Sequence, residues 1–307
     1  MTLAAGSEAA TAPGQELEFT CTCPCKLNLF LYITGRRPDG YHNLQTLFVV
    51  LNYGDRLSVK VLPHSDLLSL KCDLEIPPEH NLALKAARAL LPYRRNGAGV
   101  SMTLRKVLPP GGGIGAGSAN AAAVLLILNE LWDCRLAEGQ LIDLAAALGA
   151  DVPVFIKGTT CLGEGIGEIL TEVDYPQRWY TVCNPGCKVP TAQMFASALL
   201  KKDFKPKSLT QLLRMDFDNC FTAVTTALFP QVAALLKLLE NCPGCVQHGM
   251  SGSGSSCFAA FDSENAAKEC CAKLKRQGLA AFTARSCLKN PVKAALSEGL
   301  ASQLNCP

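Results

Sequence analysis

Residues Pro109–Ala123 read PPGGGIGAGSANAAA, a glycine-rich run that passes directly into an alanine-rich one. Glycine occupies five of the seven positions from 111 to 117, and the alanine-rich run that follows predicts a helix over about 119–132. Glycine backbones can turn several N–H groups toward one point, and the first turn of a helix adds unpaired N–H donors. The stretch therefore predicts a phosphate-binding loop that opens a helix.

Two familiar phosphate loops fit this stretch poorly. Gly112 and Gly117 have the Walker A spacing, but Ser118 stands where that loop needs lysine. A G-x-G-x-x-A pattern begins at Gly111, but a dinucleotide loop also needs an acidic residue at the end of the next strand, and Glu130 lies within the predicted helix instead. On these residues alone, a dinucleotide loop, a different nucleotide-phosphate loop and a flexible surface turn remain open.

The rest of the chain alternates strands and helices without a regular βαβ period, which predicts an α+β fold rather than a doubly wound one. A length of 307 residues favours about two domains. We expect a disordered leader over 1–18, a first domain over 19–172 and a second domain over 173–307. Strands are predicted at 26–32, 44–51, 56–62, 100–104, 179–183, 257–261 and 279–285. Helices are predicted at 81–91, 119–132, 136–148, 191–200, 209–224, 230–241 and 264–277.

Charge and hydropathy exclude several classes of protein. The formal net charge is +3 and no basic face interleaved with aromatic residues is evident, so no nucleic-acid partner is expected. No apolar run approaches the roughly 18 residues of a membrane-spanning helix, so no membrane partner is expected either. The N-terminus has neither a basic segment nor an apolar core, which argues against a secretory signal. Together with the many cysteines, this leads us to expect a protein of the reducing cytoplasm.

The 16 cysteines form no recognisable metal site. Cys21, Cys23 and Cys25 are spaced C-x-C-x-C, which differs from the C-x-x-C of zinc knuckles. Cys242 and Cys245 do have C-x-x-C spacing, but no second pair of ligands complements them at the usual distance. We therefore expect mostly free thiols that behave as small buried hydrophobic groups, and no bound metal.

Five segments together resemble the GHMP kinase superfamily, whose members phosphorylate small metabolites with ATP. The stretch at 109–123 resembles its ATP-phosphate motif, and GMSGSGS at 249–255 resembles its third, glycine-rich motif. Three more segments are CKLNLFLY at 25–32, RPDGYH at 37–42 and GADVPVF at 149–155. They narrow the resemblance to the branch that phosphorylates 4-diphosphocytidyl-2-C-methyl-D-erythritol in the non-mevalonate route to isoprenoids.

This resemblance covers residues from about 23 to 287 and implies a two-domain GHMP-kinase-like fold. Its N-terminal part would be a nucleotide-binding domain similar to ribosomal protein S5, and its C-terminal part an α/β-plait domain that closes the cleft. It also implies ATP as co-substrate with Mg²⁺ delivered with it, a small-molecule acceptor that carries cytidine diphosphate, and a monomer or weak homodimer.

The resemblance assigns the chemistry to two residues. Asp151 matches the family's catalytic aspartate, which accepts the proton of the substrate hydroxyl. Lys26 is then the partner cation, which orients Asp151 and offsets charge on the transferred phosphoryl group. On the residues alone, Asp151 also fits a turn or N-cap aspartate, and Lys26 an outward-facing strand lysine. Whether Asp151 is a true base or an electrostatic positioner stays open.

The same resemblance places five residues at the acceptor. Tyr41 and Phe195 would flank the cytosine ring, and His42 would hydrogen-bond to its edge, because flat rings stack on a base. Asn28 and Thr191 would contact the diphosphate or the methylerythritol part. Without the resemblance, His42 is also an ordinary loop histidine and Phe195 an ordinary core residue.

The residues implied at ATP are the glycine stretch and two positions outside it. Asn81 and Lys106 would lie near the adenine, although a helix cap and a solvated lysine are alternative interpretations. Ala116 and Ala119 stand where the family has glycine and serine, so Ala116 needs a backbone that tolerates Cβ and Ala119 lacks a hydroxyl. Ser118 is the evident candidate ligand for magnesium. The full set is Asn81, Lys106, Pro109, Pro110, Gly111, Gly112, Gly113, Ile114, Gly115, Ala116, Gly117, Ser118 and Ala119.

Three alternatives make different predictions. Another GHMP kinase with a smaller substrate would leave Tyr41 and His42 away from the cleft. A non-catalytic RNA-binding protein, suggested by the ribosomal likeness, would carry a basic face. A dehydrogenase would bind a nicotinamide cofactor.

Overall fold

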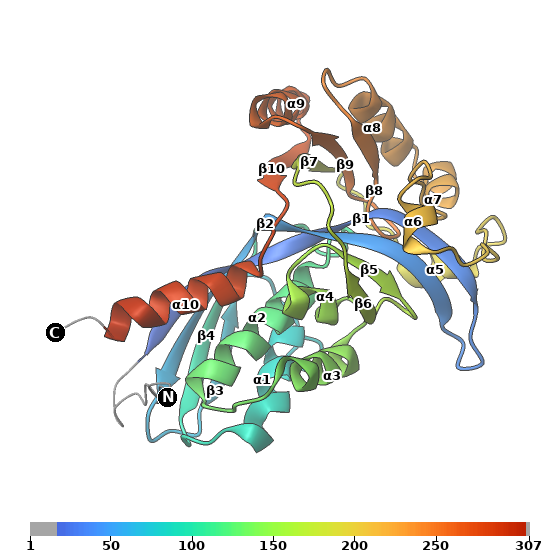
Figure 1. Ribbon diagram of the computed structural model, residues 1–307. Helices are drawn as coiled ribbons and strands as arrows, with labels where there is room; N and C mark the ends of the chain where they lie inside the picture. Colours follow the sequence, from blue (N-terminus) through green and yellow to red (C-terminus); the bar gives the residue numbers. More distant parts are fainter. Residues whose placement is uncertain (1–16, 305–307) are drawn as a thin grey trace, which may run out of the picture.

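Two long antiparallel strands run across the whole molecule (Figure 1). They are β1 (Glu18–Arg36) and β2 (His42–Leu62) in a computed structural model that describes residues 17–304. Shifts of register interrupt the pairing at three places, and such bulges bend a ribbon. The strands expected separately at 26–32, 44–51 and 56–62 are parts of these two.

The first strand starts inside the segment expected to be a leader. Of residues 1–18, positions 1–16 lie outside the described residues. The carbonyl of Leu17 accepts a hydrogen bond from the N–H of Val61 at 2.9 Å, and Glu18 begins β1. The expected boundary at residue 18 is corrected accordingly, because residues 17 and 18 already pair with β2.

The first sheet has six strands. Besides β1 and β2 it contains β3 (Leu68–Cys72), β4 (Gly99–Arg105), β5 (Cys161–Glu164) and β6 (Ile169–Glu172). The order is β3-β4-β2-β5-β6, and β1 pairs with β2 off this path. Because β2 is so long, it pairs with β4 near its end and with β5 near its start.

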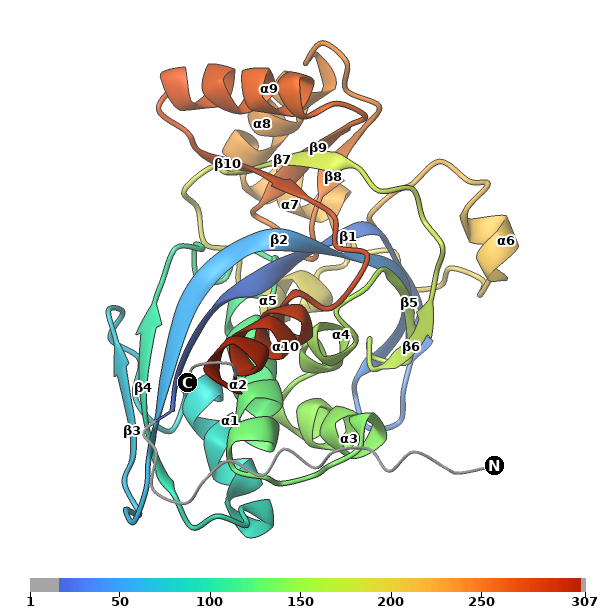
Figure 2. The same cartoon turned by 60° about the vertical axis from the view of Figure 1, so that its left-hand side comes forward.

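Four helices and a short 3-10 turn lie on the concave side of this curved sheet (Figure 2). They are α1 (Leu82–Leu90), η1 (Leu91–Tyr93), α2 (Ala116–Leu131), α3 (Glu138–Leu148) and α4 (Val152–Lys157). α2 is buried on nearly every side because its sequence is apolar all round. The helices expected at 81–91, 119–132 and 136–148 are confirmed, although α2 begins earlier than expected.

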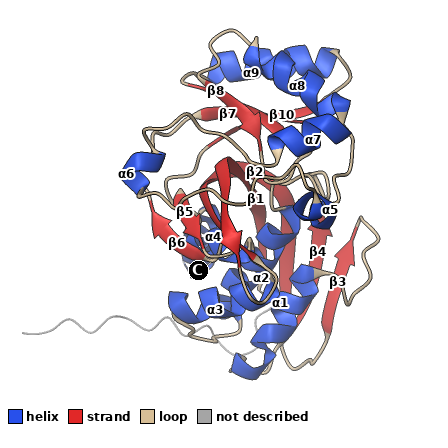
Figure 3. Cartoon of the chain, turned by 90° about the vertical axis from the view of Figure 1, so that its right-hand side faces the viewer, coloured by secondary structure: helices blue, strands red, loops and turns tan. Residues whose placement is uncertain are grey.

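A second sheet stands at the opposite end of the molecule from α1 and α3 (Figures 1 and 3). Its order is β10-β7-β9-β8, with β7 (Trp179–Asn184), β8 (Gln247–Met250), β9 (Cys257–Phe261) and β10 (Ala280–Arg285). Its helices are α5 (Thr191–Ala196), α6 (Leu209–Leu212), α7 (Thr222–Leu228), α8 (Pro230–Glu240) and α9 (Glu264–Arg276). The expected helix over 209–224 is therefore two short ones, and the expected two-domain α+β fold is confirmed.

The last described helix returns to the first sheet. α10 (Pro291–Leu304) lies against β1 and α2 (Figure 2), and its Val292 and Leu296 are buried in the same hydrophobic core as α2. Asn290 fixes the start of α10, because its Nδ2 donates to two carbonyl oxygens of α4. The range 173–307, expected as one second domain, thus contributes this helix to the first domain.

None of the helices in the described part of the chain is both long and apolar enough to cross a bilayer. Within residues 17–304, no three side chains of the types that bind metals gather into a cluster suited to an ion. The described cysteines are free thiols and most of them are buried, as their sequence context indicates.

Candidate active site

The glycine loop takes a left-handed backbone at alternate positions. Gly111, Gly113 and Gly115 have φ angles of +70°, +76° and +72°, a region that residues with a Cβ avoid. A Cβ on Gly113 would lie 2.2 Å from the carbonyl oxygen of Ser251. A Cβ on Gly115 would lie 2.8 Å from the ring of Phe155. Both the turn and the close packing need glycine here, which argues against a flexible surface turn.

The loop ends in the first turn of α2. Gly115 occupies the N-cap position and has no side chain that could cap this end. The N–H groups of residues 116–118 have no acceptor within the helix, whereas that of Ala119 donates to the carbonyl oxygen of Gly115 at 2.8 Å. Open N–H groups and the partial positive charge of a helix N-terminus together suit a phosphate group.

Two alanines depart from the family motif in this turn. Ala116 is the first residue of α2, where the helical backbone tolerates a Cβ. Ala119 is 1% exposed and packs in the hydrophobic core, as does Ile114 on the loop. The side chains of the two alanines therefore contribute to packing. Ser118 supplies the hydroxyl group in this turn of α2.

A second glycine-rich loop, between β8 and β9, lies against the first one. Ser251 joins the two loops to β1: its Oγ donates to the carbonyl oxygen of Gly113 at 2.8 Å and accepts from the N–H of Asn28 at 3.1 Å. The N–H of Ser256 donates to the carbonyl oxygen of Gly112 at 3.1 Å. The glycine-rich loops of the two domains are thus in direct contact beside β1.

Lys26 is a buried cation beside these two loops, with a side chain that is 3% exposed. Its Nζ donates to Oδ1 of Asn28 at 2.5 Å and to the carbonyl oxygen of Gly113 at 3.1 Å. Oδ2 of Asp151 lies 3.2 Å from the same nitrogen, and the ring of Phe48 lies 5.4 Å away. The alternative of an outward-facing lysine is wrong, because β1 is covered on both faces here.

Asp151 stands at the N-cap position of α4 without capping it. The N–H of Val152 donates to the carbonyl oxygen of Gly149 at 3.0 Å, and Pro153 occupies the first turn, so a tight turn fixes the aspartate. Its carboxylate is directed to Lys26 instead of the helix, and the side chain is 38% exposed. The carboxylate is thus oriented by a cation and is also accessible to solvent, so it can contact the hydroxyl group of a bound molecule.

An aromatic cluster lies where the hairpin of β1 and β2 meets α5. The ring of His42 stacks on Phe195 with centroids 5.0 Å apart and planes 19° apart, and Phe195 meets Phe221 edge-on. Burial, followed by the charges of Lys202 and Arg36, lowers the pKa of His42 below its ordinary value of 6.5. At neutral pH this is an uncharged, flat surface of the kind that binds a planar ring.

The other residues expected at the acceptor differ in their surroundings. Asn28 is 2% exposed and its Nδ2 donates to Oγ1 of Thr46 at 2.8 Å. Oγ1 of Thr191 lies 2.8 Å from Oγ of Ser253, so it touches the second glycine-rich loop. Tyr41 is 61% exposed near the hairpin tip, and His42 takes the stacking place on Phe195. Asn28 and Thr191 thus both contact the second glycine-rich loop, Thr191 shares α5 with Phe195, and Tyr41 stays exposed.

The two residues expected near adenine have structural partners. Oδ1 of Asn81 accepts hydrogen bonds from the first turn of α1, so the interpretation as a helix cap is confirmed. Nζ of Lys106 forms an ion pair with Asp55, which is fully buried on β2. The interpretation of Lys106 as a solvated lysine is therefore wrong.

Two residues of this region were missed from the sequence. Asp55 falls between the two segments expected as strands and follows Gly54, a context typical of a turn, so no local pattern revealed its burial on β2. Ser251 was quoted within a motif but not assigned a contact. Its role depends on a loop from the other domain, which no local pattern reveals.

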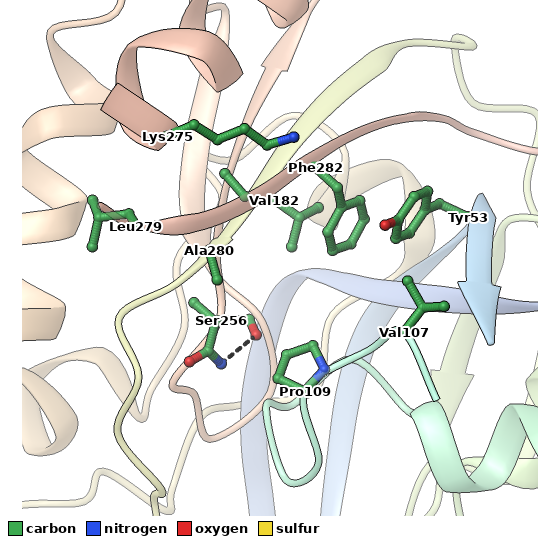
Figure 4. A pocket seen from close by; sticks show the side chains of 11 residues that line it. Tyr53, Val107, Pro109, Val182, Ser256, Lys275, Leu279, Ala280 and Phe282 are labelled. Carbon is green, nitrogen blue, oxygen red and sulfur yellow. Dashed lines mark hydrogen bonds between the residues drawn. The ribbon is translucent and has the colours of Figure 1, made fainter. Parts of the chain in front are cut away.

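A pocket of about 200 Å³ lies behind the start of the glycine loop, between the two domains (Figure 4). Val107 and Pro109 line one side, the stacked rings of Tyr53 and Phe282 another, and Lys275 reaches in from α9. Neither Lys26 nor Asp151 lines this pocket. The pocket is therefore separate from the exposed carboxylate of Asp151, where a substrate hydroxyl could bind.

Comparison with known proteins agrees with this geometry. Residues 81–159 match the N terminal domain of GHMP kinases, and residues 195–280 match the GHMP kinases C terminal domain. The chain is similar to a solved 4-(cytidine 5'-diphospho)-2C-methyl-D-erythritol kinase, with 31% identity, 87% of this chain and 99% of that chain covered, and a TM-score of 0.75.

Two more solved structures share the fold at lower identity. A homoserine kinase from Cytophaga hutchinsonii is 16% identical, with 93% of this chain and 99% of that chain covered and a TM-score of 0.68. Mevalonate kinase from L. major, in complex with R-mevalonate, is 15% identical, with 90% and 98% covered and a TM-score of 0.59. A dinucleotide loop is excluded by these matches, and the protein belongs to the GHMP kinase family, whose members are small-molecule kinases that use ATP as co-substrate.

Proposed function

We propose that this protein transfers the γ-phosphoryl group of ATP to the 2-hydroxyl of 4-diphosphocytidyl-2-C-methyl-D-erythritol, in the non-mevalonate route to isoprenoid precursors. The observation that carries the proposal is the stack of His42 on Phe195, an uncharged aromatic surface next to the second glycine-rich loop. Such a surface suits a cytosine ring, which a small acceptor such as homoserine lacks. The similarity at 31% identity to a kinase of this name supports the same acceptor.

The phosphates of ATP would bind at the glycine loop and the first turn of α2. The open N–H groups of residues 116–118 fit phosphate oxygens, and the left-handed glycines keep side chains out of their way. Mg²⁺ delivered with ATP would offset phosphate charge, with the hydroxyl of Ser118 as its candidate protein ligand. Mainly backbone donors would hold the nucleotide, which explains why the two alanines are tolerated.

Asp151 and Lys26 would carry the transfer. As the acceptor oxygen bonds to the γ-phosphorus, the bond from that phosphorus to ADP breaks and the hydroxyl proton passes to the carboxylate of Asp151. The buried ammonium of Lys26, 3.2 Å from that carboxylate, orients it and offsets charge on the transferred group.

The acceptor would lie between the hairpin and α5. The cytosine would displace the ring of His42 from the face of Phe195. Phe195 would then stack on the base, His42 would hydrogen-bond to the edge of the base, and the exposed ring of Tyr41 would cover the base from the hairpin tip. Asn28 and Thr191, which both touch the second glycine-rich loop, would contact the diphosphate or the methylerythritol part.

An assay of ADP release tests the proposal with the cytidine substrate against mevalonate, homoserine and galactose. We expect turnover of the cytidine substrate to exceed the others by at least about 100-fold, because only it can use the aromatic surface. Phe195→Leu should raise KM for this substrate and leave KM for ATP unchanged. Phe229→Leu, in a partly buried ring at the start of α8, is the matched control. Folded protein that turns over another acceptor and not the cytidine substrate would sink the proposal.

A further inference from the structure

Asp55 is a fully buried carboxylate at the base of the glycine loop, with an exposure of 0%. Its Oδ1 accepts hydrogen bonds from the N–H groups of Val107 at 2.7 Å and Leu108 at 2.9 Å. Its Oδ2 accepts from Nδ2 of Asn120 at 3.0 Å and pairs with Nζ of Lys106. A buried carboxylate is retained at little cost only when donors surround it in this way.

These donors come from both sides of the loop. Val107 and Leu108 directly precede residues 109–115, and Asn120 follows them in α2. One side chain on β2 therefore ties the entrance of the loop to the helix that carries the open N–H groups. The same carboxylate thus contacts the residues before the loop and the helix after it.

The helix side of this link depends on Asp55. Asn120 is 3% exposed, and its Oδ1 is buried with no hydrogen-bond partner within the described residues. Its other polar atom, Nδ2, donates to Asp55. The amide is thus held in an apolar helix by the carboxylate, and Lys106 supplies the positive charge that makes the buried carboxylate tolerable.

We propose that Asp55 is a positioning residue for the nucleotide: it fixes both flanks of the glycine loop so that the first turn of α2 is aimed at the phosphates. Lys106 then acts by neutralising Asp55 rather than by contact with adenine. The inference rests on the glycine loop being the ATP loop, as proposed above, and it is independent of the acceptor.

Titration of the full-length protein with ATP in the absence of acceptor tests this directly. Asp55→Asn keeps the shape of the side chain but removes its charge and one acceptor oxygen. We expect Kd and KM for ATP to rise about fivefold or more, because small misplacements of binding groups weaken binding strongly, while KM for the acceptor stays within about twofold.

Asn129→Ser is the matched control. Asn129 is a buried amide at the other end of α2, and it bonds to the N–H of Leu136 at 2.9 Å and to its carbonyl oxygen at 3.2 Å. Its replacement should lower the melting temperature and leave Kd for ATP unchanged. An equal rise in Kd for this variant would overturn the proposal, since loss of stability alone would then explain the effect.

Asn120→Ala keeps the test decisive if Asp55→Asn does not fold. Alanine favours the helix, and the change cuts only the link from α2 to Asp55. We expect a smaller rise in Kd for ATP, about two- to fivefold, and a less than additive effect in the double variant where it folds. Unchanged ATP affinity in Asn120→Ala would contradict the proposal. Because no acceptor is present, failure of the cytidine assay would leave this result standing.

Discussion

The ammonium of Lys26 lies 3.2 Å from Oδ2 of Asp151, and this contact joins the first strand of the chain to the start of α4. The two partners differ in exposure, at 3% for the lysine side chain and 38% for the aspartate. The pair therefore presents its carboxylate to an incoming hydroxyl and keeps its cation behind, where water does not screen the positive charge.

Asp151→Asn should lower kcat by about 10²- to 10⁴-fold, the usual contribution of a positioned acid or base. The melting temperature should fall as well, because the change leaves the buried ammonium of Lys26 without its carboxylate partner. ADP release and thermal unfolding measure the two effects. Asp143→Asn, on the exposed side of α3, is the matched control. A rate near that of the wild type would remove Asp151 from the mechanism.

Gly113→Ala should raise KM for ATP and lower stability together. The residue has φ of +76°, and an added Cβ would lie 2.2 Å from the carbonyl oxygen of Ser251, so the two glycine-rich loops must separate. Strain of this kind costs about 1–3 kcal/mol before the overlap is counted. Gly139→Ala, in the first turn of α3 with open space around it, should be neutral or stabilising. ATP titration and urea unfolding compare them, and equal behaviour would contradict the packing argument.

The pH dependence of KM for the cytidine substrate should report His42. Burial and the charges of Lys202 and Arg36 lower its pKa below 6.5, so the ring is neutral at pH 7 and gains a proton as pH falls through that lowered value. KM should rise there, since a charged ring between two cations is harder to bury beneath a ligand.

Lys202→Gln should raise the pKa of His42 toward 6.5 and move this acid limb to higher pH. Titration of the imidazole proton resonances by NMR, with His42→Asn to assign them, gives the pKa itself. An acid limb that stays in place in Lys202→Gln would show that another group titrates.

Leu296→Ala should destabilise the first domain by about 2–5 kcal/mol, the usual cost of emptying a buried leucine site. Leu296 is 4% exposed in the core that also contains α2, although the sequence placed it in the second domain. Leu288→Ala, at 66% exposure just before α10, should have little effect. Urea unfolding followed by circular dichroism measures the difference. Equal stability of the two variants would show that α10 is not part of that core.

Local patterns predicted a good part of the fold. The N-cap at Asn81 and the apolar face that follows it lie within a few residues of α1, and Gly149 directly follows α3. These local signals were enough to predict α1 and the end of α3. The phosphate loop could be predicted for the same reason, because its glycines are adjacent in the sequence. By contrast, Leu296 of α10 packs in a core built mainly from residues far earlier in the chain. No sequence pattern near Leu296 predicts that it packs in the core of the first domain.

The phosphate loop, the family resemblance and the candidate pair of Lys26 and Asp151 could all be predicted from the amino-acid sequence. The burial of the charged groups, and their partners, became evident only from the folded chain. Asp55 on β2 pairs with Lys106, which directly follows the neighbouring strand β4, and Ser251 reaches Gly113 from the other domain. A residue's own neighbours set its backbone preference, but the cost of burying its charge depends on donors that folding brings from elsewhere.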